Sequence, residues 1–328
     1  MGEEGKRLGV LGTFVWDTIW PPGGSERPIE QWGGLAYSLA AFSAVCPPGW
    51  TIRPITRIGA DLADRAGAFL SSLPSVSWRE GLRVVPEPTN RVELRYHDAG
   101  ERSETLTGGV SSWTWRELSP LLTGVDALYV NFVSGLEMDL ETLRSVRAEL
   151  QAPIYVDLHS LFLGPPGDGP RQPRRLPDWE QWLECCDAVQ LNRVELGLLG
   201  SGGGEPPGRL EEIPSHGPLL AVVTEGGEGA RYVSRVDLPS PAVWPQWRQV
   251  DPPAMSAIGR HVPAPKGPME GDPTGCGDVW GSVNFAGLLA GYTVPEAIQR
   301  AHHAAAAKIE TAAISSLSEA IRRRVNGA

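Results

Sequence analysis

The chain has 328 residues and a formal net charge of −10 at pH 7, with 29 Lys and Arg against 39 Asp and Glu. This acidic balance argues against nucleic acid and against anionic membrane surfaces as partners. Hydrophobic residues make up 41% and charged residues 21%, a composition that allows a packed chain with a sizeable core.

The N-terminal residues 1–7 mix acidic and basic side chains and lack the apolar stretch of a signal peptide. No segment reaches the roughly 18 apolar residues that a membrane helix needs. The four cysteines, two of them adjacent at Cys185 and Cys186, fit neither a CxxC metal pair nor a disulfide framework. These features predict a cytoplasmic protein.

Short apolar runs alternate with amphipathic stretches along the chain. Buried strands are predicted at residues 7–14, 51–58, 126–132, 152–158, 187–191 and 219–224. Helices are predicted at residues 35–45, 62–73, 140–150, 193–199, 279–290 and 295–309. This alternation indicates an α/β fold with a mostly parallel, doubly wound sheet and helices on both faces. Such sheets bind ligands beyond the carboxyl ends of their strands.

Two regions depart from this alternation. Residues 84–106 contain apolar positions that alternate with polar ones before an Asp-Ala-Gly turn, which predicts a β-hairpin with one solvated face. We expect this hairpin to form a flap on the α/β body. Residues 237–271 are rich in Pro and Trp and too long for an ordinary connection, so they are expected to be an insertion that is functional or mobile.

The segment at residues 271–285, GDPTGCGDVWGSVNF, carries the clearest chemical signal. A glycine-rich turn that opens a helix can direct backbone N–H groups and the positive end of the helix dipole at an anion. The N–H groups of Gly275, Cys276 and Gly277 are the candidates. Asp278 follows at the helix start, where it could accept a proton or merely cap the helix. An anion site beside a base suits phosphoryl transfer to a hydroxyl.

In this segment the sequence resembles the ribokinase-like (PfkB) carbohydrate kinase family, whose signature is D-T-T-G-A-G-D. The chain has Asp-Pro-Thr-Gly-Cys-Gly-Asp at residues 272–278, with proline and cysteine at two positions of the pattern. The resemblance extends over nearly the whole chain. Its earlier matches are Asp17, the Gly33–Gly34 pair followed by Ser38 where the family has asparagine, and the R-I-G-A-D run at residues 57–61. It implies substrate contacts for Asp17, Gly33, Gly34 and Ser38.

Later matches concern the phosphate donor. Asn192 and Glu195 match the family's N-x-x-E motif, which implies roles in binding Mg²⁺ and phosphate. The alternative is a helix cap followed by a solvated glutamate. Residues 223–229 resemble the family's nucleotide-bordering loop, which implies that Thr224, Gly226, Gly227 and Gly229 border the nucleotide.

Two further assignments follow from the same resemblance. His302 falls where some relatives contact adenine, and the alternative for this histidine is packing in the core of an alanine-rich helix. Asp272 is expected to help bind a monovalent cation beside the anion site, as in several relatives. However, the chain beyond His302 lacks the glycine-containing second half of that site.

The resemblance implies a single ribokinase-like kinase domain over residues 1–328. It would be a three-layer, Rossmann-like arrangement with a small β-strand lid near residues 16–32 and 84–106. The implied activity is ATP- and Mg²⁺-dependent phosphorylation of a hydroxyl on a sugar or nucleoside, with Asp278 as general base. A catalytically quiet nucleotide- or sugar-binding protein is the alternative. Lid strands of the family often pair between subunits, so a homodimer is a further expectation.

Overall fold

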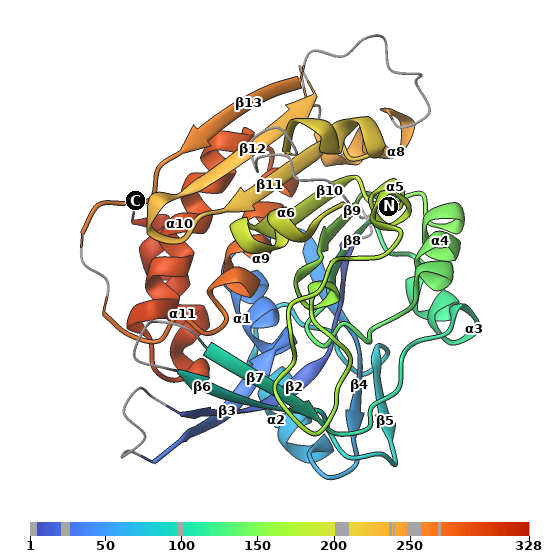
Figure 1. Ribbon diagram of the computed structural model, residues 1–328, viewed down its shortest axis with the longest axis vertical. Helices are drawn as coiled ribbons and strands as arrows, with labels where there is room; N and C mark the ends of the chain where they lie inside the picture. Colours follow the sequence, from blue (N-terminus) through green and yellow to red (C-terminus); the bar gives the residue numbers. More distant parts are fainter. Residues whose placement is uncertain are drawn as a thin grey trace.

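The computed structural model describes residues 5–20, 27–96, 102–200, 210–235, 238, 240–247, 257–267 and 270–327 (Figure 1). Within these residues a nine-stranded sheet has the order β13-β12-β11-β10-β9-β8-β1-β4-β5, and a four-stranded sheet has the order β3-β2-β6-β7. The large sheet comprises β1 (Lys6–Leu11), β4 (Trp50–Gly59), β5 (Leu82–Val85), β8 (Ala127–Asn131), β9 (Ile154–Asp157), β10 (Ala188–Asn192), β11 (Leu220–Thr224), β12 (Ala230–Arg235) and β13 (Ala257–Val262).

The strands from β11 to β5 pair in parallel, and β12 and β13 extend the sheet as antiparallel strands. The parallel strands are buried because helices cover both faces, which is why their sequences are continuous apolar runs. Along β8, Tyr129 belongs to the core on one face, whereas Leu128 and Val130 belong to the core on the other. The predicted α/β fold with a mostly parallel sheet is confirmed.

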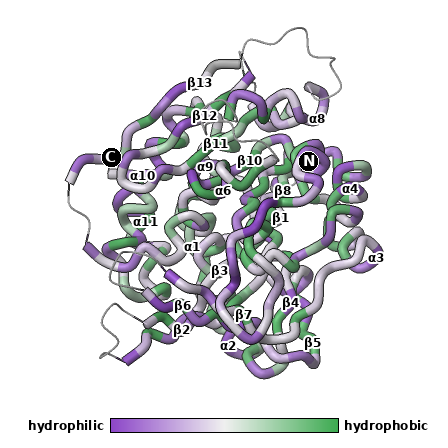
Figure 2. The backbone as a smooth tube through the Cα atoms, viewed as in Figure 1, coloured by the Kyte–Doolittle hydropathy of each residue, from purple (hydrophilic) through white to green (hydrophobic). Residues whose placement is uncertain are grey.

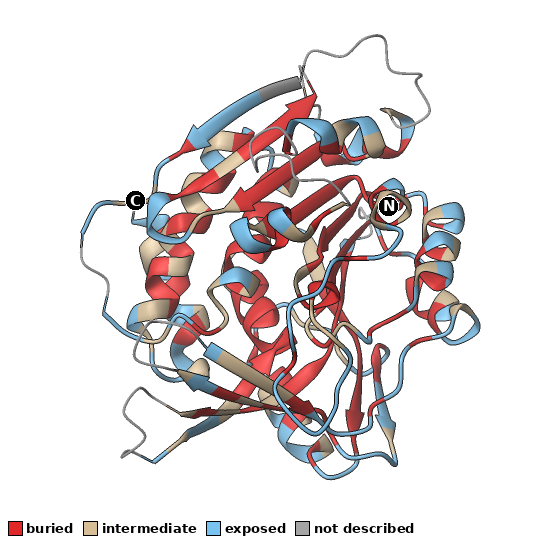
Figure 3. Ribbon diagram, in the orientation of Figure 1, coloured by how far each residue is buried: buried red, intermediate tan, exposed pale blue. Residues whose placement is uncertain are grey.

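The helices lie in two layers (Figure 1). The core on one face contains side chains from α1 (Leu35–Val45), α2 (Ala63–Ser72), α9 (Cys276–Leu289), α10 (Val294–Glu310) and α11 (Ile314–Asn326). The other core contains side chains from α3 (Trp115–Leu118), α4 (Leu140–Glu149), α5 (Trp179–Glu184) and α6 (Arg193–Leu198). Figure 3 shows the strands buried between these layers, and Figure 2 shows the hydrophobic residues along them.

The smaller sheet, which we call the lid sheet, consists of β2 (Phe14–Trp20), β3 (Ile29–Gly34), β6 (Arg91–Tyr96) and β7 (Arg102–Thr107). Parallel pairing of β2 with β6 joins two segments that are distant in sequence. Val15, Ile19, Val92, Leu94 and Leu106 form a separate small core beneath it. The turn predicted at residues 98–100 lies outside the described residues.

The region predicted as an insertion takes part in the fold where it is described. Residues 241–243 and α8 (Trp244–Trp247) form short helical turns that bury Trp244, and β13 pairs with β12. Much of the remainder lies outside the described residues. Among the described helices, none has the length and apolar character required to cross a bilayer.

Candidate active site

The carboxyl ends of four neighbouring strands place polar side chains in one row. The parallel register puts Asn131 of β8 opposite Asp157 of β9, Asp157 opposite Gln190 of β10, and Asn192 opposite Thr224 of β11. A cavity of about 240 Å³ lies at this edge, between the large sheet, the lid sheet and the start of α9. The location is the one expected for a ligand site in a doubly wound sheet.

The glycine-rich turn forms the wall of this cavity at the start of α9. Gly275 precedes the helix with φ 80°, and a Cβ there would lie 2.3 Å from a ring carbon of Tyr37, so this position requires glycine. Gly275 and Gly277 line the cavity. The N–H of Cys276 instead donates to the carbonyl oxygen of Pro273 at 3.1 Å. The predicted anion-binding role of the Cys276 N–H is therefore corrected, because that donor already closes the turn.

Asp278 lies half-buried in the first turn of α9 and lines the cavity. Its Oδ1 accepts a hydrogen bond from Asn131 Nδ2 at 2.6 Å. Burial raises the pKa of the Asp278 carboxyl above its usual value, while the Asn131 hydrogen bond and the positive charges of His159, Arg102 and Lys308 oppose that rise. A carboxylate with a raised pKa at a cavity wall suits the work of a general base.

The residues predicted to contact substrate fall into two groups. Asp17 on β2 and Gly34 at the end of β3 line the cavity, whereas Gly33 lies behind Asp17. Ser38 is fully buried on α1 and accepts a hydrogen bond from Asn131 Nδ2 at 3.1 Å. The predicted substrate contact of Ser38 is corrected accordingly, since its hydroxyl supports the amide that holds Asp278.

The lid sheet brings further charge to the cavity. Burial raises the pKa of the Asp17 carboxyl, and the nearby Asp278 charge raises it further. Arg102 and Glu104 of β7 line the same space. Glu104 is held by an ion pair with Arg171 at 3.3 Å. The cavity thus offers a hydroxyl-bearing ligand both carboxylates and a guanidinium.

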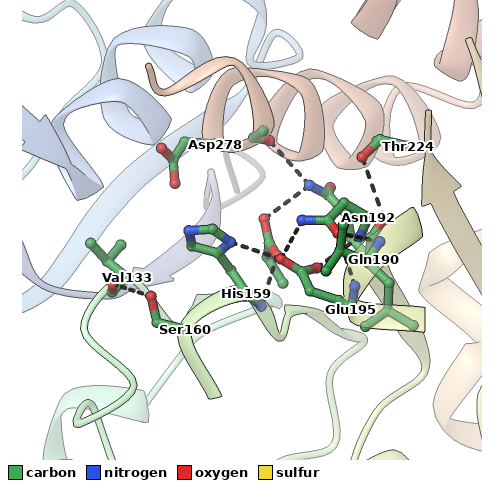
Figure 4. Close-up of polar contacts among 12 residues, drawn as sticks. Val133, His159, Ser160, Gln190, Asn192, Glu195, Thr224 and Asp278 are labelled. Atoms are coloured by element: carbon green, nitrogen blue, oxygen red, sulfur yellow. Dashed lines mark hydrogen bonds and ion pairs between the residues drawn. The ribbon is translucent and has the colours of Figure 1, made fainter. Parts of the chain in front are cut away.

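Asn192 and Glu195 form a closed capping arrangement at the start of α6. Asn192 Oδ1 accepts from the N–H groups of Val194 and Glu195, and the Glu195 carboxylate accepts from Asn192 N and Nδ2. Glu195 Oε1 also lies 2.9 Å from His159 Nδ1 (Figure 4). Burial alone lowers the pKa of His159, but the hydrogen bond and charge of Glu195 outweigh it and raise that pKa to about 9.

The donor set at Asn192 and Glu195 limits how Mg²⁺ could bind. Protein N–H groups already occupy both Glu195 oxygens, and the described residues contain no cluster of three His, Cys, Asp or Glu that could hold a metal ion. Mg²⁺ usually keeps several waters and takes one or two carboxylates together with substrate phosphates. The residues therefore fit an ion held mainly by the donor phosphates and by water beside Glu195.

The predicted nucleotide-bordering loop begins at the end of β11. Thr224 lines the cavity, and its hydroxyl lies 3.4 Å from the Leu191 carbonyl oxygen. The next residues form a short 3₁₀ turn at Gly226–Glu228, where Gly226 and Gly227 are exposed beyond the described cavity lining. Gly229 is buried against β13.

His302 lies in the interior of the protein. Trp280 Nε1 donates to His302 Nδ1 at 3.1 Å, so His302 Nε2 carries the proton and donates to the Val262 carbonyl oxygen at 3.1 Å. Burial lowers the pKa of this ring, which stays neutral. The predicted adenine contact is corrected, because both ring nitrogens serve the core.

Asp272 precedes the turn and is bound by Lys308 of α10. Lys308 Nζ donates to the Asp272 carbonyl oxygen at 3.0 Å and lies 3.7 Å from Asp272 Oδ2. A protein ammonium therefore stands where a monovalent cation was expected. The cation site predicted at Asp272 does not fit this geometry.

Comparisons with known proteins show the fold that this chain shares. The model of the pfkB family carbohydrate kinases matches residues 168–320. A pyrophosphate-dependent kinase in the ribokinase family superposes with a TM-score of 0.74 at 17% identity, covering 95% of this chain and 99% of that chain. The fold is ribokinase-like. The sequence resemblance to the PfkB family is thereby confirmed.

Two other solved structures have a similar fold. A nucleoside kinase of Burkholderia thailandensis in complex with inosine has a TM-score of 0.70 at 17% identity and covers 98% of both chains. An Arabidopsis thaliana ribokinase in complex with ribose and ATP has a TM-score of 0.66 at 15% identity and also covers 98% of both chains. No curated protein matches the sequence.

The candidate site contains residues that sequence reasoning did not assign. Asn131 and Gln190 are strand residues, and Gln190 Nε2 joins Asp157 Oδ2 at 2.9 Å to the Gly277 carbonyl oxygen at 3.1 Å. A polar residue at the carboxyl end of an apolar run, as in D-A-L-Y-V-N, is the signal that could have identified Asn131. Arg102 and Glu104 belong to the predicted flap, and no local pattern in that hairpin shows that these two side chains line the cavity.

Proposed function

We propose that the protein is a kinase that transfers a phosphoryl group to a hydroxyl of a sugar or nucleoside. The observation that carries the proposal is the Asp278 carboxylate, held by Asn131 at the start of α9 and facing a cavity that Asp17 also lines. A pure binding protein has no need of a carboxylate with a raised pKa at the positive end of a helix. A cytoplasmic homodimer remains a prediction.

Asp278 is proposed to accept the proton of the substrate hydroxyl as its oxygen attacks the terminal phosphorus of the donor. The bond from that phosphorus to the leaving oxygen breaks in line. The N–H groups of Gly275 and Gly277 and the start of α9 stabilise charge on the transferring group. His159 adds a positive charge on the same side, held by Glu195. Glu195 would help to hold Mg²⁺ through water, and the ion would supply further charge neutralisation when bound.

Asp17, Arg102 and Glu104 are proposed to select the acceptor. A carboxylate can accept hydrogen bonds from two hydroxyls and fix their orientation, and Arg102 can donate to a ring or hydroxyl oxygen. Val15, Val92, Leu94 and Val133 provide an apolar wall in the same cavity. This mixture suits the polar edge and the apolar face of a sugar or nucleoside.

ATP is the proposed donor, because a ribokinase with this fold is found in complex with ribose and ATP. Inorganic pyrophosphate is the second candidate, because the similar structures include a pyrophosphate-dependent kinase. The same turn and helix start could bind the terminal phosphates of either donor.

The proposal is tested by incubating the protein with Mg²⁺ and either ATP or pyrophosphate over a panel of sugars and nucleosides. Formation of phosphorylated acceptor is the readout. Asp278→Asn keeps the size of the side chain and is expected to lower kcat by roughly 10²- to 10⁴-fold, the usual contribution of a general base. The control is Asp64→Asn, which removes an exposed carboxylate from the first turn of α2 and is expected to leave kcat unchanged.

The outcomes separate the rival functions. Thermal stabilisation by a nucleotide or sugar without phosphoryl transfer would favour the quiet binding protein. Near wild-type turnover in Asp278→Asn would refute the base assignment. Saturation by nucleosides but not by pentoses or hexoses would identify a nucleoside kinase.

A further inference from the structure

Lys308 is one of only three lysines in the chain, with Lys6 and Lys266, and it is the buried one. Its exposed fraction is 1%, whereas Lys6 and Lys266 are exposed. Lysine is almost never fully buried unless its ammonium group is paired. A buried ammonium in a protein so poor in lysine therefore points to a specific structural role for the contacts that this ammonium group makes.

The ammonium of Lys308 contacts Asp272, the residue that begins the turn before α9. It donates to the Asp272 carbonyl oxygen at 3.0 Å and lies 3.7 Å from the Asp272 carboxylate. Asp272 Oδ1 in turn accepts from the Thr274 N–H at 2.9 Å. Lys308 thus holds the first residue of the D-P-T-G-C-G-D run through its carbonyl group and its side chain.

Tyr37 connects this ammonium to the cavity. Lys308 Nζ lies 5.3 Å from the centroid of the Tyr37 ring, within the range of a cation–π contact. Gly275 also lies against that ring, and a Cβ there would come within 2.3 Å of it. Tyr37 and Gly275 both line the cavity. The ammonium therefore supports the wall where the donor phosphates are proposed to bind.

The backbone before the turn is shaped to allow this contact. Gly271 has φ 142°, and a Cβ there would lie 1.9 Å from the Ile309 carbonyl oxygen of α10. Only glycine permits so close an approach between the backbone at this position and α10. Gly271 consequently brings Asp272 next to Lys308, near the end of α10.

We propose that the Lys308 ammonium is a built-in cation that fills the place of a monovalent metal ion at Asp272 and holds the phosphate-binding turn in its active shape. Its charge acts through Asp272 and Tyr37 on the turn, so Lys308 is a positioning residue. The protein accordingly works without added K⁺. This inference rests on the proposed kinase function for its kinetic consequences, but the occupation of the site can be tested without turnover.

Three proteins test the proposal: the wild type, Lys308→Met and Lys308→Ala. Lys308→Met removes the charge and keeps most of the volume, whereas Lys308→Ala also leaves room for an ion. Lys266→Met is the matched control, because Lys266 is exposed. Each protein is measured in KCl, NH₄Cl and tetramethylammonium chloride at equal ionic strength, both by thermal unfolding and by kcat/KM.

We expect the wild type and Lys266→Met to have the same Tm and kcat/KM in all three salts. We expect Lys308→Met to lose about tenfold or more in kcat/KM in every salt, the loss of one hydrogen bond to a charged group. Lys308→Ala should show a similar loss in tetramethylammonium chloride, with recovery of both Tm and kcat/KM when NH₄⁺ or K⁺ is added.

The opposite results overturn the proposal. One such result is a wild-type kcat/KM or Tm that is higher in KCl than in tetramethylammonium chloride. The other is a Lys308→Met protein whose kcat/KM and Tm equal those of the wild type. If neither variant folds, the salt response of the wild type still decides. If the wild type phosphorylates no acceptor, the Tm values in the three salts still test whether Lys308 occupies the site, so the two failures are distinguishable.

Discussion

Asp278 and His159 are among the cavity-lining side chains whose pKa values are shifted upward, and the physical reason differs between them. Burial raises the pKa of Asp278, because a carboxylate loses hydration at the cavity wall. The pKa of His159 rises to about 9 despite burial, because the Glu195 carboxylate accepts its Nδ1 proton and stabilises its positive charge. The proposed reaction uses Asp278 ionised and His159 protonated.

The pH dependence of kcat/KM follows from these two states. The rate is expected to fall on the acid side as Asp278 gains a proton, at a pH above the ordinary carboxyl pKa of 3.8. It is expected to fall on the alkaline side as pH rises through about 9, where His159 loses its proton. A pH–rate profile of the wild type measures both limbs.

His159→Asn serves to assign the alkaline limb. This variant should have a lower rate at neutral pH and no fall in rate near pH 9, whereas the control His303→Asn, on α10 outside the cavity lining, should keep the wild-type profile. An unchanged alkaline limb in His159→Asn would assign that limb to another group.

At the scale of elements, α10 matters because it carries Lys308 to the turn. Its N-terminus is closed by a capping box, in which Thr293 N and Oγ1 both donate to Glu296 Oε2, at 2.9 and 2.7 Å. Loss of such a cap costs about 1 kcal/mol of stability. The helix packs against α9, so this loss should appear in global unfolding rather than in local fraying alone.

Thr293→Ala is therefore expected to lower the free energy of unfolding by about 1 kcal/mol in urea denaturation, and Thr293→Ser to restore it. The m-value should not change, because the surface exposed on unfolding is the same. A Thr293→Ser protein as unstable as Thr293→Ala would show that the hydroxyl cap is not the cause.

The elements that sequence predicted well are those buried on both sides. Residues 126–132 were predicted as a strand and β8 is Ala127–Asn131, while the helix predicted at residues 35–45 coincides with α1. One apolar run misled the prediction. Residues 7–14 read as one strand, but the chain leaves the large sheet after Leu11 and Phe14 begins β2 of the lid sheet. Hydrophobicity is continuous across that change of sheet, so the pattern cannot show it.

Site residues could be predicted from the sequence where they belong to a contiguous motif, and not where they meet only through tertiary packing. Asp278 belongs to a contiguous motif, whereas its partner Asn131 comes from a strand 147 residues away and meets it through tertiary packing. For His302 the sequence left two readings open, and the hydrogen bonds to Trp280 and Val262 place it in the core. The burial of Lys308 could not be predicted, because an isolated lysine in a helix usually lies at the surface.

At the scale of the whole molecule, two sheets supply the two halves of the cavity. The lid sheet contributes Asp17, and the large sheet with α9 contributes Asp278. Ligand binding to both halves should therefore stabilise the folded protein. A ligand at 100 times its Kd adds about 2.7 kcal/mol to the free energy of unfolding, which thermal unfolding can measure.

Asp17→Asn separates the two halves in this measurement. We expect it to abolish most of the stabilisation by the acceptor while leaving that by the donor nucleotide or pyrophosphate intact. Equal loss of both would contradict the assignment of Asp17 to the acceptor, and the Asp64→Asn protein provides the unperturbed reference.

The hydrogen bond between Tyr96 of the lid sheet and Thr274 of the turn, at 2.8 Å between the hydroxyl oxygens, ties the two halves together. The proposed acceptor contacts come from β2 and β7, whereas the proposed phosphate contacts come from the turn, so the two binding tasks fall on separate elements. Exchanging the hairpin strands β6 and β7 for those of another kinase would replace Arg102 and Glu104 but leave Asp17 on β2, so acceptor choice should change only in part, provided that Tyr96 is retained as the link to the turn.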